Sequence, residues 1–191
     1  MNKRSGIESK KRIIDAALGL FSEYGYSKAS MRMIANAASI SIGGLYLYFK
    51  NKDELYLTLI ESRLDELADM TRKSLKDIDD PAEAVSKFIS LHLAYAKKHR
   101  ELLLVQGREH GFTSGISAKR KFFKTQRGFI EGIIRKGIRS GVFKKCNVKE
   151  TAKIIFCTIR GFVLSLILET DALFSPHECS KLILNGLLKK E

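Results

Sequence analysis

The sequence predicts an all-α protein of about nine helices, with a small N-terminal unit followed by a larger helical unit. Only two prolines occur in 191 residues, so few positions would interrupt a helix. Apolar residues make up 45% of the chain, which is enough to fill a packed core. No segment alternates Val, Ile and Thr with polar residues between turn signals, so we expect no sheet.

The first helix is expected over residues 8–24. Ile14, Leu18 and Phe21 recur there at helical spacing. Gly25 follows, at a position where a glycine commonly ends a helix. The sequence therefore predicts one amphipathic helix before the first turn.

Two short helices are expected next, joined by a tight turn at residues 39–40. Ser30 can cap a helix over residues 31–38, and Ser41 can cap another over residues 42–49. Two short helices separated by such a turn are a helix-turn-helix candidate. The N-terminal unit is therefore predicted to be a three-helix helix-turn-helix domain.

A long helix and five further helices complete the expected set. Asn51 and Glu54 have the spacing of a capping box, and the helix that they open continues to about Lys76. Pro81 suits the first turn of the next helix. The later helices are expected over residues 81–99, 101–110, 118–139, 148–169 and 176–188. The second half of helix 148–169 is apolar nearly all round, which is typical of a helix buried in a core or against a partner chain.

The boundary between the two domains is expected near Leu55, inside the long helix. We therefore predict a helix-turn-helix domain in residues 1–55 and a larger helical domain in residues 56–191. No flexible linker separates them in the sequence, so we expect the two domains to be mechanically coupled.

The charge of the chain favours a polyanionic partner. The formal net charge is +13 and the sequence pI is about 9.7, which suits nucleic acid or an anionic membrane surface. Most of the excess follows residue 115, where residues 116–191 carry sixteen lysines and arginines against six acidic residues.

Several classes of protein are disfavoured by what the sequence lacks. Cys146, Cys157 and Cys179 are odd in number and have no C-x-x-C spacing, so we expect neither a disulfide framework nor a zinc site. The four histidines have no cysteine or acidic partner at metal-ligand spacing, so we expect structural or surface histidines, no metal and no cofactor. None of the common enzyme motifs occurs, so we expect no enzyme.

Targeting signals are also missing. The N-terminus lacks the apolar segment of a signal peptide. The longest apolar run, residues 154–168, is interrupted by Arg160 and is shorter than the roughly 20 residues of a membrane span. We therefore expect a soluble, cytoplasmic protein.

The stretch SISIGGLYLYFKNKDEL, residues 39–55, carries the strongest functional signal. In a helix-turn-helix the second helix enters the major groove, where large side chains would hold its backbone away from the bases. Gly43 and Gly44 would allow close approach, and the neighbouring tyrosine and serine hydroxyls can donate to phosphate. The stretch therefore favours a DNA duplex as the partner.

Residues 9–56 resemble the DNA-binding domain of the tetracycline-repressor (TetR) family of bacterial transcription regulators. The resemblance rests on the segments RIIDAALGLFSEYGYSKASMRMIANAASIS and IGGLYLYFKNKDEL. It implies a repressor that binds a palindromic operator as a homodimer and leaves it when a small-molecule effector binds. It also implies that residues 56–191 form the ligand-binding and dimerisation domain, with dimerisation through the last two long helices.

The resemblance and the stretch together assign nine residues to the DNA interface. These are Ser30, Arg32, Ser41, Ile42, Gly43, Gly44, Tyr46, Tyr48 and Lys52. Tyr46 and Lys52 match the phosphate-binding tyrosine and lysine of the family. The position of Tyr48 along the helix fits a buried core residue as well as a residue that contacts DNA. Leu47 departs from the family pattern, in which a histidine or another ring often stands at this position.

Four residues are candidates for contact with the effector: Arg160, Phe129, Phe122 and Arg127. Arg160 lies inside an apolar helix, and a buried guanidinium needs a partner on another helix, a second subunit or a ligand. The basic run of residues 119–127 is either a solvated helix face or part of an anion site. An anionic amphiphile, such as an acyl-coenzyme A or a fatty acid, is the expected effector.

An alternative from a different class remains open at this point. A basic helical protein could also be an adaptor that binds membranes or acidic proteins. Preference for a palindromic DNA sequence would separate the two hypotheses, whereas salt dependence alone would not.

Overall fold

The computed structural model describes residues 3–105, 115–168 and 175–189. Within these residues the fold is all-α with nine helices and no strand, which confirms the predicted fold class. One isolated antiparallel bridge joins Phe143 and Leu188. By their contacts the residues divide into two compact units: unit 1 comprises residues 1–63 and 101–116, and unit 2 comprises residues 64–100 and 117–191.

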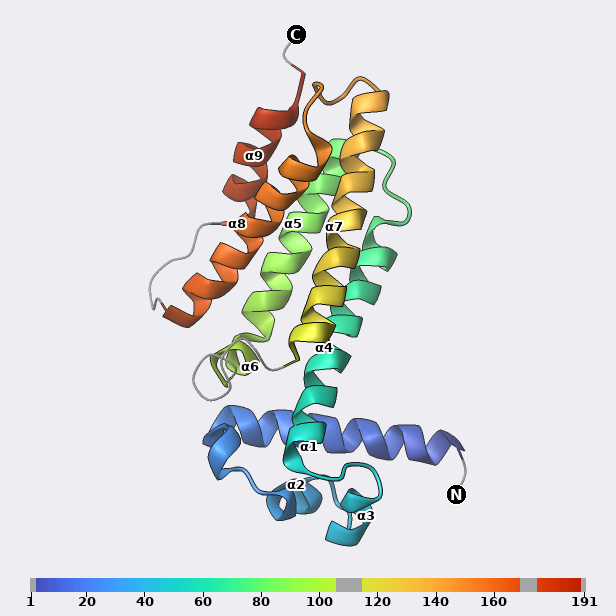
Figure 1. Ribbon diagram of the computed structural model, residues 1–191, viewed down its shortest axis with the longest axis vertical. Helices are drawn as coiled ribbons and strands as arrows, with labels where there is room; N and C mark the ends of the chain where they lie inside the picture. Colours follow the sequence, from blue (N-terminus) through green and yellow to red (C-terminus); the bar gives the residue numbers. More distant parts are fainter. Residues whose placement is uncertain (1–2, 106–114, 169–174, 190–191) are drawn as a thin grey trace. The chain divides into compact units, whose positions relative to one another are not determined.

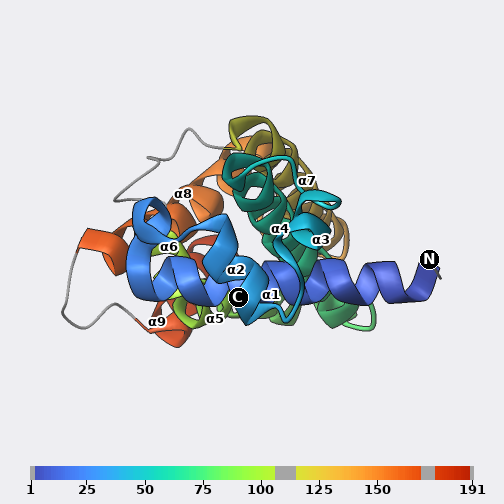
Figure 2. The same ribbon diagram turned by 90° about the horizontal axis from the view of Figure 1, so that it is seen from below.

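Unit 1 contains α1 (Lys3–Lys28), α2 (Met31–Ala37), α3 (Ile42–Tyr46), the first half of α4 (Lys52–Leu75) and most of α6 (Arg100–Val105). In Figure 1, α2 and α3 lie together below α1, and Figure 2 views them from that side. Gly25 has a positive φ of 80°, so the backbone leaves helical geometry where a helix end was predicted. A further turn then continues to Lys28.

The core of unit 1 is built where the predicted helices share apolar faces. Ile13 and Phe21 of α1 are fully buried, and so are Ile34 of α2 and Leu45 of α3. Phe21 also packs edge-on against Tyr56 of α4, with ring centroids 5.6 Å apart. Buried side chains therefore hold α1 against α4, and α2 packs against both α1 and α3.

The start of α4 confirms the predicted capping interaction. The Glu54 N–H donates to Asn51 Oδ1 at 2.8 Å, and the Lys50 N–H donates to Glu54 Oε2 at 2.7 Å. The helix runs without interruption from unit 1 into unit 2. The predicted domain boundary between residues 55 and 56 stays a prediction.

Unit 2 contains the second half of α4 with α5 (Pro81–Lys98), α7 (Ile116–Arg139), α8 (Val148–Leu168) and α9 (Pro176–Leu187). Figure 1 shows these helices side by side, with α5 packed against α8 and α9. Half of the α5 residues are buried, among them Phe88, His92 and Leu93. The helix predicted over residues 101–110 is observed to Val105, and its remainder lies outside the described residues.

Helix α8 is long and apolar enough, by length and composition, to cross a membrane, and it alone meets this test in the described part of the chain. Core helices of soluble proteins meet the same test. Ile155, Phe156, Ile159, Phe162 and Leu166 of α8 are buried inside unit 2.

Candidate nucleic-acid interface

The turn between α2 and α3 is held by local hydrogen bonds. Ser30 Oγ accepts from the Met33 N–H at 3.2 Å, and Ser41 Oγ accepts from the Gly44 N–H at 3.0 Å. Both predicted N-caps are thus confirmed. Between the helices Ser39 adopts a positive φ of 56°, which reverses the chain within the predicted turn. The orientation of α3 relative to α2 therefore follows from backbone geometry and two caps.

One side of α3 is buried and the other is exposed. Leu45 and the following Phe49 are at most 1% exposed, as expected for core residues. On the other side Tyr46 is 52% exposed and Leu47 is 81% exposed, with Ile42 also exposed. Large apolar and aromatic side chains on the outer face of a short helix indicate a surface that meets a partner.

The two glycines of α3 have different surroundings. A Cβ atom on Gly43 would meet nothing within 4 Å, whereas one on Gly44 would lie 3.1 Å from Ser41 Oγ. Gly44 is therefore also needed for the cap, because a larger side chain would press on the serine that holds the helix start. The packing inside unit 1 leaves open space around Gly43 and would accommodate a larger side chain there.

The remaining polar candidates are available to solvent to different degrees. Ser30, Ser41 and Arg32 are exposed, whereas Tyr48 is half-buried. Each capping serine accepts with its oxygen and still has its own O–H to donate. The serines can therefore hold the helix starts and donate to a phosphate at the same time.

Lys52 already has hydrogen-bond partners at the end of α1. Its Nζ donates to the carbonyl oxygens of Tyr26 at 2.7 Å, Ser27 at 3.3 Å and Ala29 at 2.9 Å. It also lies 4.3 Å from the centroid of the Tyr26 ring. An ammonium has three donors, so the structure uses all of them to tie α1 to α4.

The same junction contains a second link between α1 and α4. The Tyr26 hydroxyl donates to Asp53 Oδ1. Burial, together with the hydrogen bond to Asp53 and its negative charge, raises the pKa of Tyr26 above its ordinary value. The phenol therefore stays protonated and keeps donating, and the start of α4 is held from two adjacent residues.

The four effector candidates do not form one cluster. Phe122 is buried, Phe129 and Arg127 are half-buried, and all three lie on α7. Arg160 of α8 is exposed in the single chain, so its predicted burial is wrong for this state. The reason is that Arg160 lies on the outer side of α8, where its guanidinium stacks 5.4 Å from the ring centroid of Phe123.

Sequence reasoning did not select Phe123, His92 or Gln126. His92 and Gln126 are 3% and 1% exposed, and a hydrogen bond between their side chains partly offsets the lowering of the His92 pKa by burial. His92 was expected to be a satisfied or surface histidine. The only available signal was its place in the apolar pattern of α5, which predicts burial without showing what its ring would meet.

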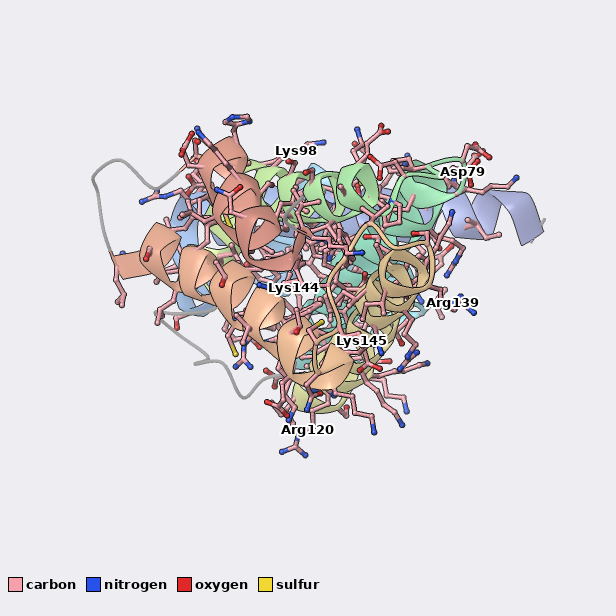
Figure 3. All side chains as sticks on the ribbon, turned by 90° about the horizontal axis from the view of Figure 1, so that it is seen from above. Asp79, Lys98, Arg120, Arg139, Lys144 and Lys145 are labelled. Atoms are coloured by element: carbon pink, nitrogen blue, oxygen red, sulfur yellow. The ribbon has the colours of Figure 1, made fainter. Side chains whose placement is uncertain are left out.

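The basic residues of unit 2 are spread over its surface. Figure 3 shows Lys98 and Arg120 on opposite sides of the unit, with Arg139 on a third. Some basic side chains are paired, as in Arg135 with Glu131 at 2.7 Å and Lys136 with Asp79 at 3.0 Å. The surplus of charge therefore does not make one compact anion site.

No group of three or more His, Cys, Asp or Glu side chains that could hold a metal ion occurs in the part of the chain that the structure describes. The three cysteines are free: Cys157 is exposed, Cys146 is half-buried and Cys179 is buried.

Both halves of the chain match known protein families. Residues 13–59 match the family described as bacterial regulatory proteins, tetR family, and residues 60–186 match the C-terminal region of YsiA-like proteins. The fatty acid metabolism regulator protein of Bacillus subtilis (strain 168) is 26% identical over 186 residues, which are 94% of this chain and 95% of that protein.

Two solved structures share the fold and hold different molecules. The transcriptional regulator FadR from Bacillus subtilis, in complex with stearoyl-CoA, has a TM-score of 0.73 at 24% identity and covers 92% of this chain and 95% of its own. A putative transcriptional regulator from Saccharomonospora viridis, in complex with choline, has a TM-score of 0.77 at 16% identity. The match covers 96% of this chain and 99% of that one. At these identities the likeness concerns the fold alone.

Proposed function

The chain belongs to the TetR family, a family of ligand-responsive DNA-binding transcription regulators, and on that premise we propose that it represses transcription until an anionic amphiphile binds. The observation that carries the DNA-binding part is the outer face of α3. There, Tyr46 and Leu47 are exposed, and the space around Gly43 is open.

In this proposal the DNA contacts divide by their chemistry. The Tyr46 hydroxyl, the capping serines and Arg32 meet phosphates and set the register of the protein on the duplex. Ile42 and the α3 glycines face base edges, where an aliphatic side chain can meet a thymine methyl group. Tyr48 borders this surface, and Lys52 adds positive charge while it holds α1 against α4.

Dimerisation supplies the second recognition helix. Helices α8 and α9 expose large apolar side chains in the single chain: Ile154, Leu164, Leu168 and Leu182. Burying these residues against the same helices of a second copy would form a symmetric interface. Two copies of α3 must then lie about one turn of DNA apart, roughly 34–36 Å, to reach both half-sites of a palindrome.

The charge of the buried residues supports an anionic effector over a cationic one. Among the described residues the buried polar and charged side chains are Thr71, His92, Lys119, Gln126 and Ser180, with no Asp or Glu. A buried cation would need a carboxylate partner. The carboxylate of Glu66 is half-buried rather than buried, and it accepts a hydrogen bond from the Tyr95 hydroxyl at 3.1 Å. The relative named as a fatty acid metabolism regulator is consistent with an acyl effector.

The uninterrupted α4 is the proposed route of coupling. An effector changes DNA binding only by its differential affinity for two states of the protein. A ligand in unit 2 that favours one position of the second half of α4 would also bias its first half, which Lys52 ties to α1. In this proposal the protein acts through binding rather than catalysis, and it works in the cytoplasm.

The test begins with the operator. Genomic fragments that the purified protein retains at moderate salt should share a palindromic sequence, and protection should extend symmetrically over both half-sites. Stearoyl-coenzyme A, stearate and hexadecyltrimethylammonium are then added to the complex. Release by the two anions supports the proposal. Retention of fragments without a common sequence would overturn DNA recognition, and release by the cation alone would overturn the effector class.

A further inference from the structure

The outer face of α3 is apolar where a recognition helix would meet the bases. Ile42, at the start of the helix, is 38% exposed, and Leu47, directly after its last residue, is 81% exposed. Gly43 and Gly44 have no side chain, and the space around Gly43 is open. Ile42 therefore stands at the point where the glycines let the backbone of α3 come close to a duplex.

Side chains that recognise bases by hydrogen bonds are absent from this part of the chain. Residues 37–49 contain no Arg, Lys, Asn, Gln, Asp or Glu, which are the residues that separate bases in the major groove by hydrogen bonds. The Ser41 hydroxyl can donate to a base, but serine contacts do not separate the base pairs. Asn51 caps α4 with its Oδ1, and Lys52 donates to three carbonyl oxygens. Polar side chains of α3 therefore cannot supply a strong preference for one base.

An aliphatic side chain can still distinguish thymine from the other bases. In the major groove thymine presents a C5-methyl group, whereas cytosine has only a hydrogen at that position. Moving one methyl-sized group from water into apolar contact is worth about fourfold in affinity. The same contact in both half-sites of a palindrome multiplies to about fifteenfold. Contact with thymine methyl groups is therefore the base recognition that the composition of α3 allows.

We propose that α3 recognises its operator through thymine methyl groups, and that Ile42 is the residue that contacts them. A thymine then stands opposite Ile42 in each half-site, on one strand or the other. The inference rests on the proposed DNA-binding function, and it adds which base the helix selects and by which atom. Tyr46 and Arg32 keep their proposed phosphate contacts, which carry no sequence preference.

Replacing thymine by uracil tests the contact without changing the base pairing. The operator fragment retained by the full-length protein is synthesised with uracil at one thymine position at a time, in both half-sites together. Uracil lacks only the C5-methyl group. At least one position should weaken binding by about fifteenfold in fluorescence anisotropy, and thymines outside the half-sites should tolerate the change. Equal binding at every position would overturn the inference.

Protein variants show which side chain meets the methyl group. Ile42→Ala should bind the thymine operator more weakly than the wild type, and uracil at the sensitive position should then cost no further affinity. Leu47→Ala is the matched control from the same surface, and it should keep the full penalty of uracil at that position. Circular dichroism verifies that both variants fold. A penalty that persists in Ile42→Ala would assign the methyl effect to duplex shape or another side chain, which contradicts the proposal.

A second modified base separates the effect of the methyl group from that of the base pair. Cytosine in place of the sensitive thymine gives a C·G pair, and binding should fall. 5-Methylcytosine keeps this pair and returns a methyl group to the groove, so binding should recover by about fourfold per half-site. Lack of recovery would refute methyl recognition. This measurement uses the wild-type protein and remains informative if a variant does not fold.

A further base analogue tests recognition by hydrogen bonds instead. 7-Deazaguanine lacks the N7 acceptor to which an arginine donates. If this analogue weakens binding, Arg32→Ala abolishes the effect and uracil has none, then α2 selects the operator and the inference is wrong, although the protein still binds DNA. Retained fragments without a common palindrome would overturn the proposed function itself.

Discussion

At the α2–α3 surface the capping hydrogen bonds join residues three positions apart in the sequence, whereas in the interior a polar pair joins two separate helices, α5 and α7. Ser30 and Ser41 each cap a helix within three residues, and Gly43 leaves open space. His92 and Gln126 are separated by 34 positions in the sequence, are almost fully buried and are joined by a hydrogen bond between their side chains. The helix-turn-helix caps are therefore fixed by local sequence, whereas the buried polar pair depends on tertiary packing.

This difference has a physical origin. A surface that must fit a rigid duplex gains from being fixed in advance, because less ordering is needed on binding. A buried polar side chain costs stability unless it is hydrogen-bonded, so His92 and Gln126 must meet across two packed helices.

Gly43→Leu should reduce specific operator binding by at least a hundredfold, because the side chain would keep α3 out of the groove. The melting temperature should hold or rise, since the space around Gly43 is open and leucine is the better helix former. Electrophoretic mobility shift and circular dichroism measure the two effects. Gly19→Leu, on α1 with equally open space, is the matched control and should bind normally. Normal binding by Gly43→Leu would remove this glycine from the interface.

Acid should destabilise unit 2 through His92. Its pKa is about 4 in the folded chain against an ordinary value near 6.5, so below pH 6.5 the unfolded state binds the proton first. The contribution to stability is complete above pH 6.5 and is lost as pH falls toward 4, by about 1.4 kcal/mol per pH unit and about 3 kcal/mol in all. Denaturant titrations from pH 7 to 4 should show a shallower decline for His92→Gln. Parallel curves would contradict the burial of a neutral ring.

Lys52→Ala should lower stability as well as DNA affinity. The variant loses charge-assisted bonds to three carbonyl oxygens at the end of α1, worth about 1.5–3 kcal/mol together in this half-buried position. Lys50→Ala is the control, because Lys50 is exposed. Urea unfolding and the salt dependence of operator binding separate the two roles. Unchanged stability with a salt slope lowered by about one would mean that Lys52 serves DNA alone.

Ser39→Gly should raise the free energy of unfolding slightly, by up to about 1 kcal/mol, because glycine adopts the positive φ of this turn without strain. Operator affinity should be unchanged, since the backbone of the helix-turn-helix stays the same. A thermal melt and a mobility shift with one operator fragment suffice. A lower melting temperature would show that the Ser39 side chain has a stabilising role in the turn.

Much of the fold could be predicted because its determinants are local. The predicted caps at Ser30, Ser41 and Asn51 are observed, and each depends on residues within three positions. The helix bounds follow from the same local signals together with apolar periodicity, which fixes the face of each helix that is buried. The candidate DNA residues could be named for this reason, since they lie within 23 consecutive positions.

The tertiary structure decided the contacts between residues that are far apart in the sequence. Lys52 has the signature of a phosphate contact, and only the packing of α4 beside the end of α1 shows that its donors already have partners. Arg160 lies in an apolar helix, yet it faces outward over Phe123. Periodicity along one helix shows which side is buried but not what that side meets. The sequence alone therefore determined the helices and the DNA-binding motif, and the contact between His92 and Gln126 depended on how two separate helices, α5 and α7, pack.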